Sequence, residues 1–141
     1  MNHVPTIKNN YRRCAYNVTD DFITIPTLTD FDSPDEFYNS LFHELIHSTG
    51  HASRLNRLSV HDTQEGNSLE ELVAEIGSAY LCSMCGISNS VIDNQAAYVN
   101  WWLKLIGQDQ NVLIKASTLA KEAVEYLLTP GHLHASELVA N

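Results

Sequence analysis

The sequence predicts an α+β fold in which a small antiparallel sheet near residues 14–26 packs with about four helices. Two observations carry this prediction. Aromatic and β-branched residues gather within the first thirty positions, and four later segments carry apolar residues at helical spacing between glycine or proline stops. The length of 141 residues and the hydrophobic share of 44% suit one domain with one core. We therefore expect residues 1–141 to form a single domain.

The expected sheet is a β-hairpin. Residues 14–18 (CAYNV) and 22–26 (FITIP) carry the aromatic and β-branched side chains that strands favour. The polar residues 19–21 between them suit a turn. Pro26 cannot donate a ladder hydrogen bond, so it should end the second strand or mark it as an edge strand.

The first helix is expected to follow Ser33 and to end at Gly50. Ser33 can cap the helix, Pro34 suits its first position, and Glu36 completes a capping box. Glycine is a common C-terminal stop. The apolar residues that should face the core are Phe37, Leu41, Phe42, Leu45 and Ile46.

Three more helices are expected after a polar loop over residues 51–67. Each ends at a glycine or at the sequence Thr-Pro-Gly, and they cover roughly 69–85, 93–106 and 112–128. Cys82 and Cys85 lie in the first of these three. Because that helix is apolar and no second cysteine pair exists, we interpret them as core thiols and not as a metal or redox pair.

Charge and cysteine content narrow the class of protein. The chain has 8 basic and 17 acidic residues, a net charge of −9, which repels phosphate backbones and argues against nucleic-acid binding by this chain alone. Three cysteines do not form a disulfide framework. The N-terminus lacks a signal-peptide pattern, and no apolar run is long enough to span a membrane. We expect a soluble, cytoplasmic protein with no membrane partner.

The stretch FHELIHSTGH (42–51) contains an H-E-x-x-H motif at His43, Glu44 and His47. Residues four apart lie on one face of a helix, so both imidazoles can bind one ion, and Zn²⁺ accepts such ligands. Glu44 projects beside that ion, where it can act as general base for water that attacks a carbonyl. The other interpretation, a surface helix with two chance histidines, is much rarer in a chain of this length.

Zinc needs at least one more protein ligand. His51 is the nearest histidine, but it follows Gly50, where the helix should end. For His51, a contact with the substrate or with a metal-binding residue is therefore favoured over direct metal binding.

The expected second helix supplies a better third ligand. Its sequence ELVAE resembles the E-x-x-A-D or E-x-x-A-N signature of gluzincins. By that resemblance Glu71 would be the ligand, and Glu75 would accept a hydrogen bond from the far ring nitrogen of His43 or His47. Glu75 stays an alternative ligand, and Glu70 is the least favoured. Glu71 also completes a capping box that starts at Ser68, so a purely structural role stays open.

Two segments, residues 21–57 and 70–82, resemble the zincin-like metallopeptidase domain of ArdC-type antirestriction proteins and TraC-like primases of mobile elements. The resemblance covers about residues 10–128. It implies a zinc-dependent, peptidase-like domain of mixed α and β structure. The positions that it assigns are His43, His47 and Glu71 as zinc ligands and Glu44 as the base.

The resemblance also extends to the segment after the motif. The family pattern G-H-x-x-R-L-x-R is matched by Gly50, His51, Arg54, Leu55 and Arg57, which implies a functional role for this loop without saying which. Part of residues 14–26 would form the upper wall of the substrate cleft. The group that stabilises the oxyanion is left open among Arg54, His51, His61 and Tyr80.

Such proteins usually carry an N-terminal domain that binds single-stranded DNA, which we expect this chain to lack. A DNA-binding domain or partner would then belong to a longer protein. The predicted function is a zinc metallopeptidase that acts on a peptide or protein substrate, with Glu44 as general base. The alternative is a zinc-containing, antirestriction-like binding module that sequesters a protein partner without cleaving it.

Overall fold

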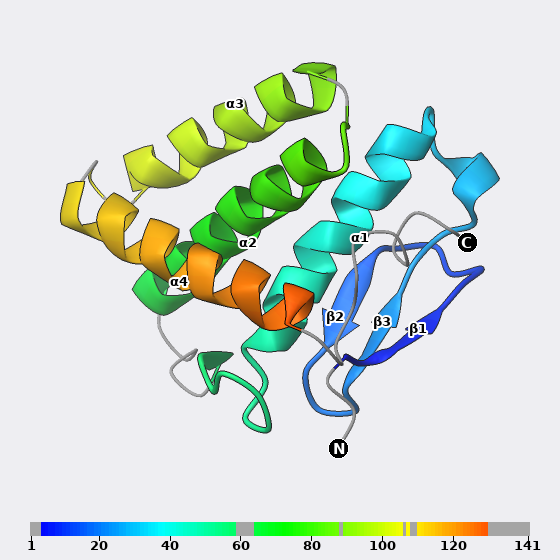
Figure 1. Ribbon diagram of the computed structural model, residues 1–141, viewed down its shortest axis with the longest axis horizontal. Coiled ribbons are helices and arrows are strands. Elements are labelled where there is room, and N and C mark those ends of the chain that lie inside the picture. The colour runs from blue at the N-terminus through cyan, green and yellow to red at the C-terminus, as the bar shows by residue number, and fades with distance from the viewer. Residues whose placement is uncertain (1–3, 59–63, 88, 106, 108–109, 130–141) are drawn as a thin grey trace.

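The computed structural model describes residues 4–58, 64–87, 89–105, 107 and 110–129. In Figure 1 the sheet lies on one side of helix α1, and the other three α-helices lie on the opposite side. The elements of this part of the chain are β1 (Thr6–Lys8), β2 (Ala15–Asn17), β3 (Phe22–Thr24), the 3-10 helix η1 (Leu28–Asp30), α1 (Pro34–Thr49), α2 (Gln64–Met84), α3 (Asn89–Leu105) and α4 (Gln110–Leu128). The predicted α+β class, with H-E-x-x-H on the first long helix, is confirmed.

The sheet is mixed, with strand order β1-β3-β2. The predicted hairpin is present, because β2 and β3 pair antiparallel with Tyr16 opposite Ile23. A third strand, β1, pairs parallel to β3 and was not predicted. It is three residues long and exposed, so no alternation of apolar and polar residues announces it. The central strand is therefore β3, and β2 is the edge strand nearest to α1.

Helix α1 forms as the capping residues predict. The Ser33 hydroxyl accepts a hydrogen bond from the Glu36 N–H at 3.2 Å, Pro34 is the first helical residue, and Gly50 follows the last. All the apolar residues that were expected to face the core are buried. The apolar face fixes the rotation of α1, and the motif residues therefore lie on its partly buried side.

Helix α2 passes unusually close to α1. A Cβ added at Gly77 would lie 2.8 Å from two side-chain carbons of Ile46, which is closer than carbon atoms approach in real structures. The missing side chain at Gly77 therefore allows the two helices to pack closely. This contact holds the glutamates of α2 against the histidines of α1.

The first residues of the later helices differ from the prediction. Helix α2 begins at Gln64 and not near 69, so Ser68 lies inside the helix and is buried, and the Ser68–Glu71 pattern is not a helix start. Helices α3 and α4 also begin earlier than expected, at Asn89 and Gln110. The first residues of all three helices are polar, so the apolar spacing that predicted each helix does not reach its first turn.

The core lies between α1, α2 and α4. Helix α4 presents small buried residues, Ala116, Ala120 and Ala123, at helical spacing, and Leu127 continues that row. All three cysteines are free thiols, and Cys82 is buried as expected. Among the described helices, none combines the length and the apolar character needed to cross a bilayer.

Candidate metal centre

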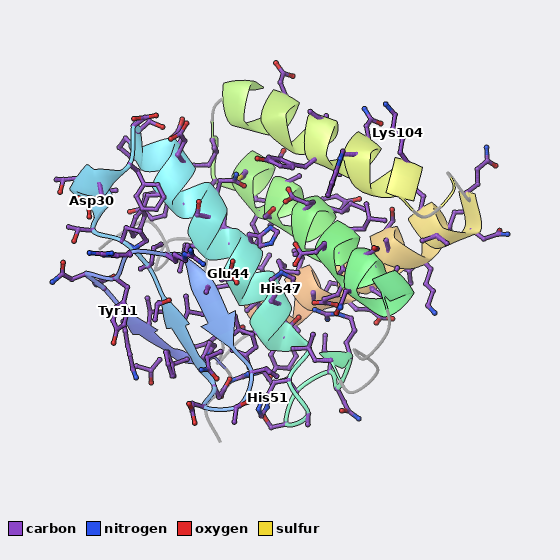
Figure 2. The ribbon with its side chains drawn as sticks, turned by 180° about the vertical axis from the view of Figure 1, so that it is seen from behind. Tyr11, Asp30, Glu44, His47, His51 and Lys104 are labelled. Atoms are coloured by element: carbon purple, nitrogen blue, oxygen red, sulfur yellow. The ribbon has the colours of Figure 1, made fainter. Side chains whose placement is uncertain are left out.

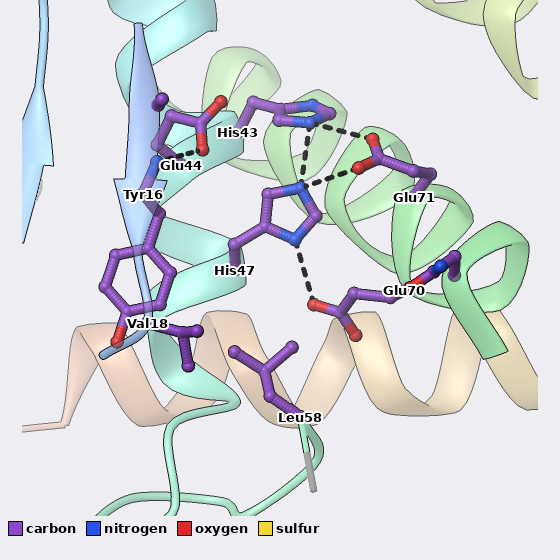
Figure 3. A pocket seen from close by; sticks show the side chains of 10 residues that line it. Tyr16, Val18, His43, Glu44, His47, Leu58, Glu70 and Glu71 are labelled. Carbon is purple, nitrogen blue, oxygen red and sulfur yellow. Dashed lines mark hydrogen bonds and ion pairs between the residues drawn. The ribbon is translucent and has the colours of Figure 1, made fainter. Parts of the chain in front are cut away.

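Three side chains from two helices converge on one point (Figure 3). His43 and His47 stand one turn apart on α1, and Glu71 reaches them from α2. The two Nε2 atoms lie 3.1 Å apart. The Glu71 carboxylate lies 3.2 Å from His43 Nε2 through one oxygen and 3.3 Å from His47 Nε2 through the other. Within the described residues, these three form the one group able to hold a metal ion.

The spacing of these donor atoms suits a divalent ion. Tetrahedral zinc has bonds of roughly 2.0–2.1 Å to nitrogen and oxygen, which places neighbouring ligand atoms roughly 3.3–3.4 Å apart. The Nε2–Nε2 separation of 3.1 Å, and the contacts of 3.2 and 3.3 Å that the two Nε2 atoms make with different Glu71 oxygens, are within a few tenths of an ångström of that spacing. Two imidazole nitrogens and one carboxylate oxygen are also a donor set that zinc accepts. The residues present therefore fit the ion that the motif implies.

Each histidine has a carboxylate beside its Nδ1 atom, which orients its Nε2 atom toward the centre. His43 Nδ1 lies 3.3 Å from a Glu75 oxygen, and His47 Nδ1 lies 3.0 Å from a Glu70 oxygen. An Nδ1–H that donates to a carboxylate leaves the Nε2 lone pair free for a metal. Glu75 lies where the sequence predicted it, against one of the two histidines. The sequence did not predict that Glu70 contacts His47 in the same way.

Hydrogen bonds between the histidines and the glutamates shift the pKa values of both in the metal-free centre. Burial alone would lower the pKa of His43 and of His47, but hydrogen bonds that they donate to neighbouring glutamates raise these pKa values to about 10 and about 9. Burial would raise the pKa of Glu71, but hydrogen bonds from the two histidines hold it far below the usual range. The metal-free centre thus retains protons that a cation would displace on binding.

Glu44 faces the same centre from the side of the sheet. One of its carboxylate oxygens accepts a hydrogen bond from the backbone N–H of Tyr16 on β2 at 2.9 Å, as Figure 3 shows. Burial raises the pKa of Glu44, and the nearby His47 and His43 oppose that shift. A carboxylate with a raised pKa beside a metal site is well matched to accept a proton from water near neutral pH.

A pocket of about 550 Å³ opens in front of these residues. Ala15 and Tyr16 of the edge strand, with Val18 just after it, line one side of the pocket, and Leu58 and α2 line the other. A second hollow of about 260 Å³ shares His43 and Glu44 with the first and continues past them to Cys14 and Tyr98. Free space therefore lies on both sides of Glu44, along the exposed edge of β2. Tyr98 is 58% exposed and lines this hollow.

The two arginines of the segment after α1 have different partners. Arg54 forms a two-pronged ion pair with Asp21 at the hairpin turn, at 2.9 and 2.7 Å, and it also donates to the Ser48 carbonyl. Arg57 forms a two-pronged ion pair with Glu70, at 2.6 and 2.9 Å. One segment thus joins α1 both to the hairpin and to the ligand-bearing helix.

The remaining predicted residues do not reach the centre. The His51 ring pairs with the Ser53 hydroxyl at 2.7 Å and is not among the metal donors. Tyr80 is half exposed, and the Arg54 guanidinium is engaged by Asp21. None of these three lines the larger pocket. His61 lies outside the described residues. In Figure 2, His51 is far from Glu44 and His47, near the lower end of the molecule.

Comparison with a family of zincin-like metallopeptidases gives a match over residues 2–119. Among curated proteins, a DNA primase TraC of Escherichia coli is 38% identical over 117 residues, covering 82% of this chain and 8% of the primase. The uncharacterized protein y4eC of Sinorhizobium fredii is 25% identical over 122 residues, covering 86% of this chain and 40% of that protein.

Solved structures of the antirestriction protein ArdC from plasmid R388 have the same fold. Its Mn(II)-bound form is 34% identical, with a TM-score of 0.72, covering 99% of this chain and 49% of ArdC. Its metal-free form is 35% identical, with a TM-score of 0.70. The chain therefore spans about half the length of ArdC and about a tenth of the TraC primases.

Proposed function

Because the chain belongs to the zincin-like metallopeptidase family, as the match over residues 2–119 establishes, we propose that it is a zinc-dependent peptidase domain. Its substrate is a peptide or protein, and its ion is held by His43, His47 and Glu71. One observation carries the proposal. The two Nε2 atoms lie 3.1 Å apart, each lies 3.2 or 3.3 Å from an oxygen of the Glu71 carboxylate, and Glu44 lies beside them in an open pocket.

Zinc is the ion that the donor set favours, because two imidazoles and a carboxylate suit its borderline-soft character. The ArdC relative in its Mn(II)-bound form indicates that manganese also merits testing at the centre. When bound, the divalent ion polarises a scissile carbonyl and lowers the pKa of water. Glu70 and Glu75 keep the Nε2 atoms of the two histidines turned toward the ion.

Glu44 is the proposed general base. It takes a proton from the attacking water and later delivers that proton to the leaving amine. Its hydrogen bond to the Tyr16 N–H fixes the carboxylate between the edge strand and the metal centre. Only one carboxylate oxygen is needed for that bond, which leaves the other to accept the proton.

The edge strand β2 is the proposed docking site for the substrate. It pairs with β3 on one side only, and its other side faces α1 and the pocket. An extended peptide can add to such an edge through backbone groups other than the Tyr16 N–H, which already donates to Glu44. The two hollows on either side of Glu44 would then receive the side chains that flank the scissile bond.

The second candidate function is a binding module that holds a metal ion and sequesters a protein partner without cleaving it. It is favoured by the likeness to ArdC, which is described as an antirestriction protein. Glu44 distinguishes the two functions, because binding a metal ion requires no glutamate between its two histidine ligands.

The test is Glu44→Gln. Glutamine keeps an oxygen for the Tyr16 N–H, so the site should keep its shape and its metal. We expect wild type and variant to bind one ion per chain, while hydrolysis of a mixed peptide library falls by about 10²–10⁴-fold in the variant. Metal retention with equal hydrolysis by both proteins would contradict the role of Glu44. Metal retention with no hydrolysis by either would favour the binding module.

A further inference from the structure

We propose that Arg57 is a positioning residue for the metal ligand His47, acting through Glu70. The inference rests on the proposed metal centre and extends it to a residue that touches neither the ion nor the pocket. It also gives a role to one arginine of the G-H-x-x-R-L-x-R pattern, for which the sequence predicted no specific role.

The contact between Arg57 and Glu70 fixes the carboxylate in one orientation. Arg57 Nε donates to one Glu70 oxygen at 2.6 Å, and Nη2 donates to the other at 2.9 Å. That second oxygen also accepts from His47 Nδ1 at 3.0 Å. A carboxylate held by both prongs of a guanidinium cannot rotate away from the imidazole.

Arg57 is itself fixed on the C-terminal turn of α1. Its Nη2 donates to the Ile46 carbonyl at 2.9 Å, and its Nη1 donates to the Thr49 hydroxyl at 3.1 Å. The Ile46 carbonyl also accepts from the Thr49 hydroxyl at 2.6 Å, and carbonyls in the last turn of a helix attract cations. A Cβ at Gly50 would lie 2.8 Å from Leu58 Cγ and 3.2 Å from the Arg57 guanidinium carbon, so the glycine leaves room for both side chains.

The burial of this group makes the arginine necessary. The Arg57 and Glu70 side chains are only 9% and 6% exposed. A buried carboxylate without its cationic partner is strongly disfavoured. If Arg57 is removed, Glu70 must rotate, take up a proton or draw in water, and each change alters the hydrogen bond that orients His47. Changes in such outer partners typically reduce metal affinity by about 10–100-fold.

Arg54 provides a matched control from the same segment. It also forms a two-pronged ion pair, with Asp21, and its side chain is only 1% exposed. Neither Asp21 at the hairpin turn nor the Ser48 carbonyl is a metal donor. Loss of Arg54 should therefore reduce stability without a selective loss of metal affinity.

The experiment compares Arg57→Gln and Arg57→Lys with Arg54→Gln and Arg54→Lys in the full chain. Affinity for Zn²⁺ and Mn²⁺ is measured at one pH by competition with a chromogenic chelator. Thermal unfolding of the metal-free proteins reports stability separately. Glu70→Gln and the double variant Arg57→Gln/Glu70→Gln complete a cycle that measures coupling between the two residues.

We expect Arg57→Gln to weaken metal affinity by about 10–100-fold and Arg57→Lys by less, since lysine keeps the charge but not the fork. The Arg54 variants should stay within about 3-fold of wild type. The double variant should lose no more than the worse single variant. Wild-type affinity in Arg57→Gln, or equal losses in the Arg54 and Arg57 variants, would overturn the inference. Absence of metal binding by the wild type would overturn the metal centre itself, and the inference with it.

Discussion

Helix α2 uses its two main interfaces in opposite ways. Toward α1 it presents Glu70, Glu71 and Glu75, which meet two histidines and an arginine in a partly buried polar cluster. Toward α4 it meets a row of buried alanines and Leu127. In Figure 1, α1 lies along one side of α2 and α4 crosses it, so one helix carries both the polar cluster and an apolar contact.

We expect the polar cluster and the apolar contact of α2 to serve different properties, metal binding and stability. Burying ionisable groups costs free energy even when they are paired, so the α1–α2 cluster is a poor source of stability without its ion. The apolar α2–α4 interface gains free energy from burial and close packing. Changes at the first interface should therefore alter metal binding and catalysis, while changes at the second should alter the free energy of unfolding.

The largest effect is expected for Glu71→Gln. The amide is isosteric but is a weak zinc ligand, so affinity for Zn²⁺ should fall by more than about 100-fold, beyond the usual loss for an outer partner. Peptide hydrolysis should fall with it. Zinc should raise the melting temperature of the wild type, because it binds only the folded state, and should leave that of the variant nearly unchanged. Unaltered affinity would show that another residue, such as Glu75, is the third ligand.

The apolar interface is tested with Leu127→Ala. Leu127 is fully buried, so the truncation should cost about 2–5 kcal/mol of unfolding free energy through lost burial and a cavity. Urea unfolding of the metal-free protein measures this cost. Folded variant protein should bind zinc with wild-type affinity, and a large loss of affinity would contradict the separation of the two interfaces.

A smaller effect is expected for Asp21→Asn. Asp21 lies at the hairpin turn, where it pairs with Arg54. Asparagine tolerates the positive φ of 52° at this position, so the backbone should be retained. The variant loses the charged partner of Arg54, which should cost about 1–3 kcal/mol near pH 7. Urea unfolding of both proteins measures this difference.

The cost of Asp21→Asn should depend on pH. Hydrogen bonds from Arg54 hold the pKa of Asp21 below its usual value against the opposing effect of burial. A carboxyl whose pKa is lowered by folding contributes stability above its unfolded pKa, about 3.9, and loses it as pH falls through the folded value. The two proteins should therefore differ most above pH 5 and converge in strong acid. A difference that does not change with pH would show that the ion pair is not its source.

The sequence predicted what local patterns specify. Ser33, Pro34 and Gly50 marked both ends of α1, and the spacing of His43 and His47 placed both on one face of that helix. Glu71 could be proposed because the resemblance names a glutamate on the next helix. Its position within 3.3 Å of both histidines then followed from the packing of α1 against α2.

What the sequence missed depends on contacts between distant segments. The bond from Tyr16 to Glu44 uses a backbone N–H, which every residue but proline has, so no side chain announces it. Glu70 was the least favoured of three glutamates, and only the fold brings Arg57 and His47 to it. Strand β1 has no pattern of its own and forms because β3 offers it an edge.

The central claim is that one divalent ion binds between His43, His47 and Glu71. Anomalous diffraction from crystals grown with zinc, collected on both sides of the zinc absorption edge, tests it most directly. The account predicts one strong peak at about 2.0–2.2 Å from both Nε2 atoms and from a Glu71 oxygen. A peak held by Glu70 or Glu75 instead, or no peak at this centre while zinc binds elsewhere, would contradict it.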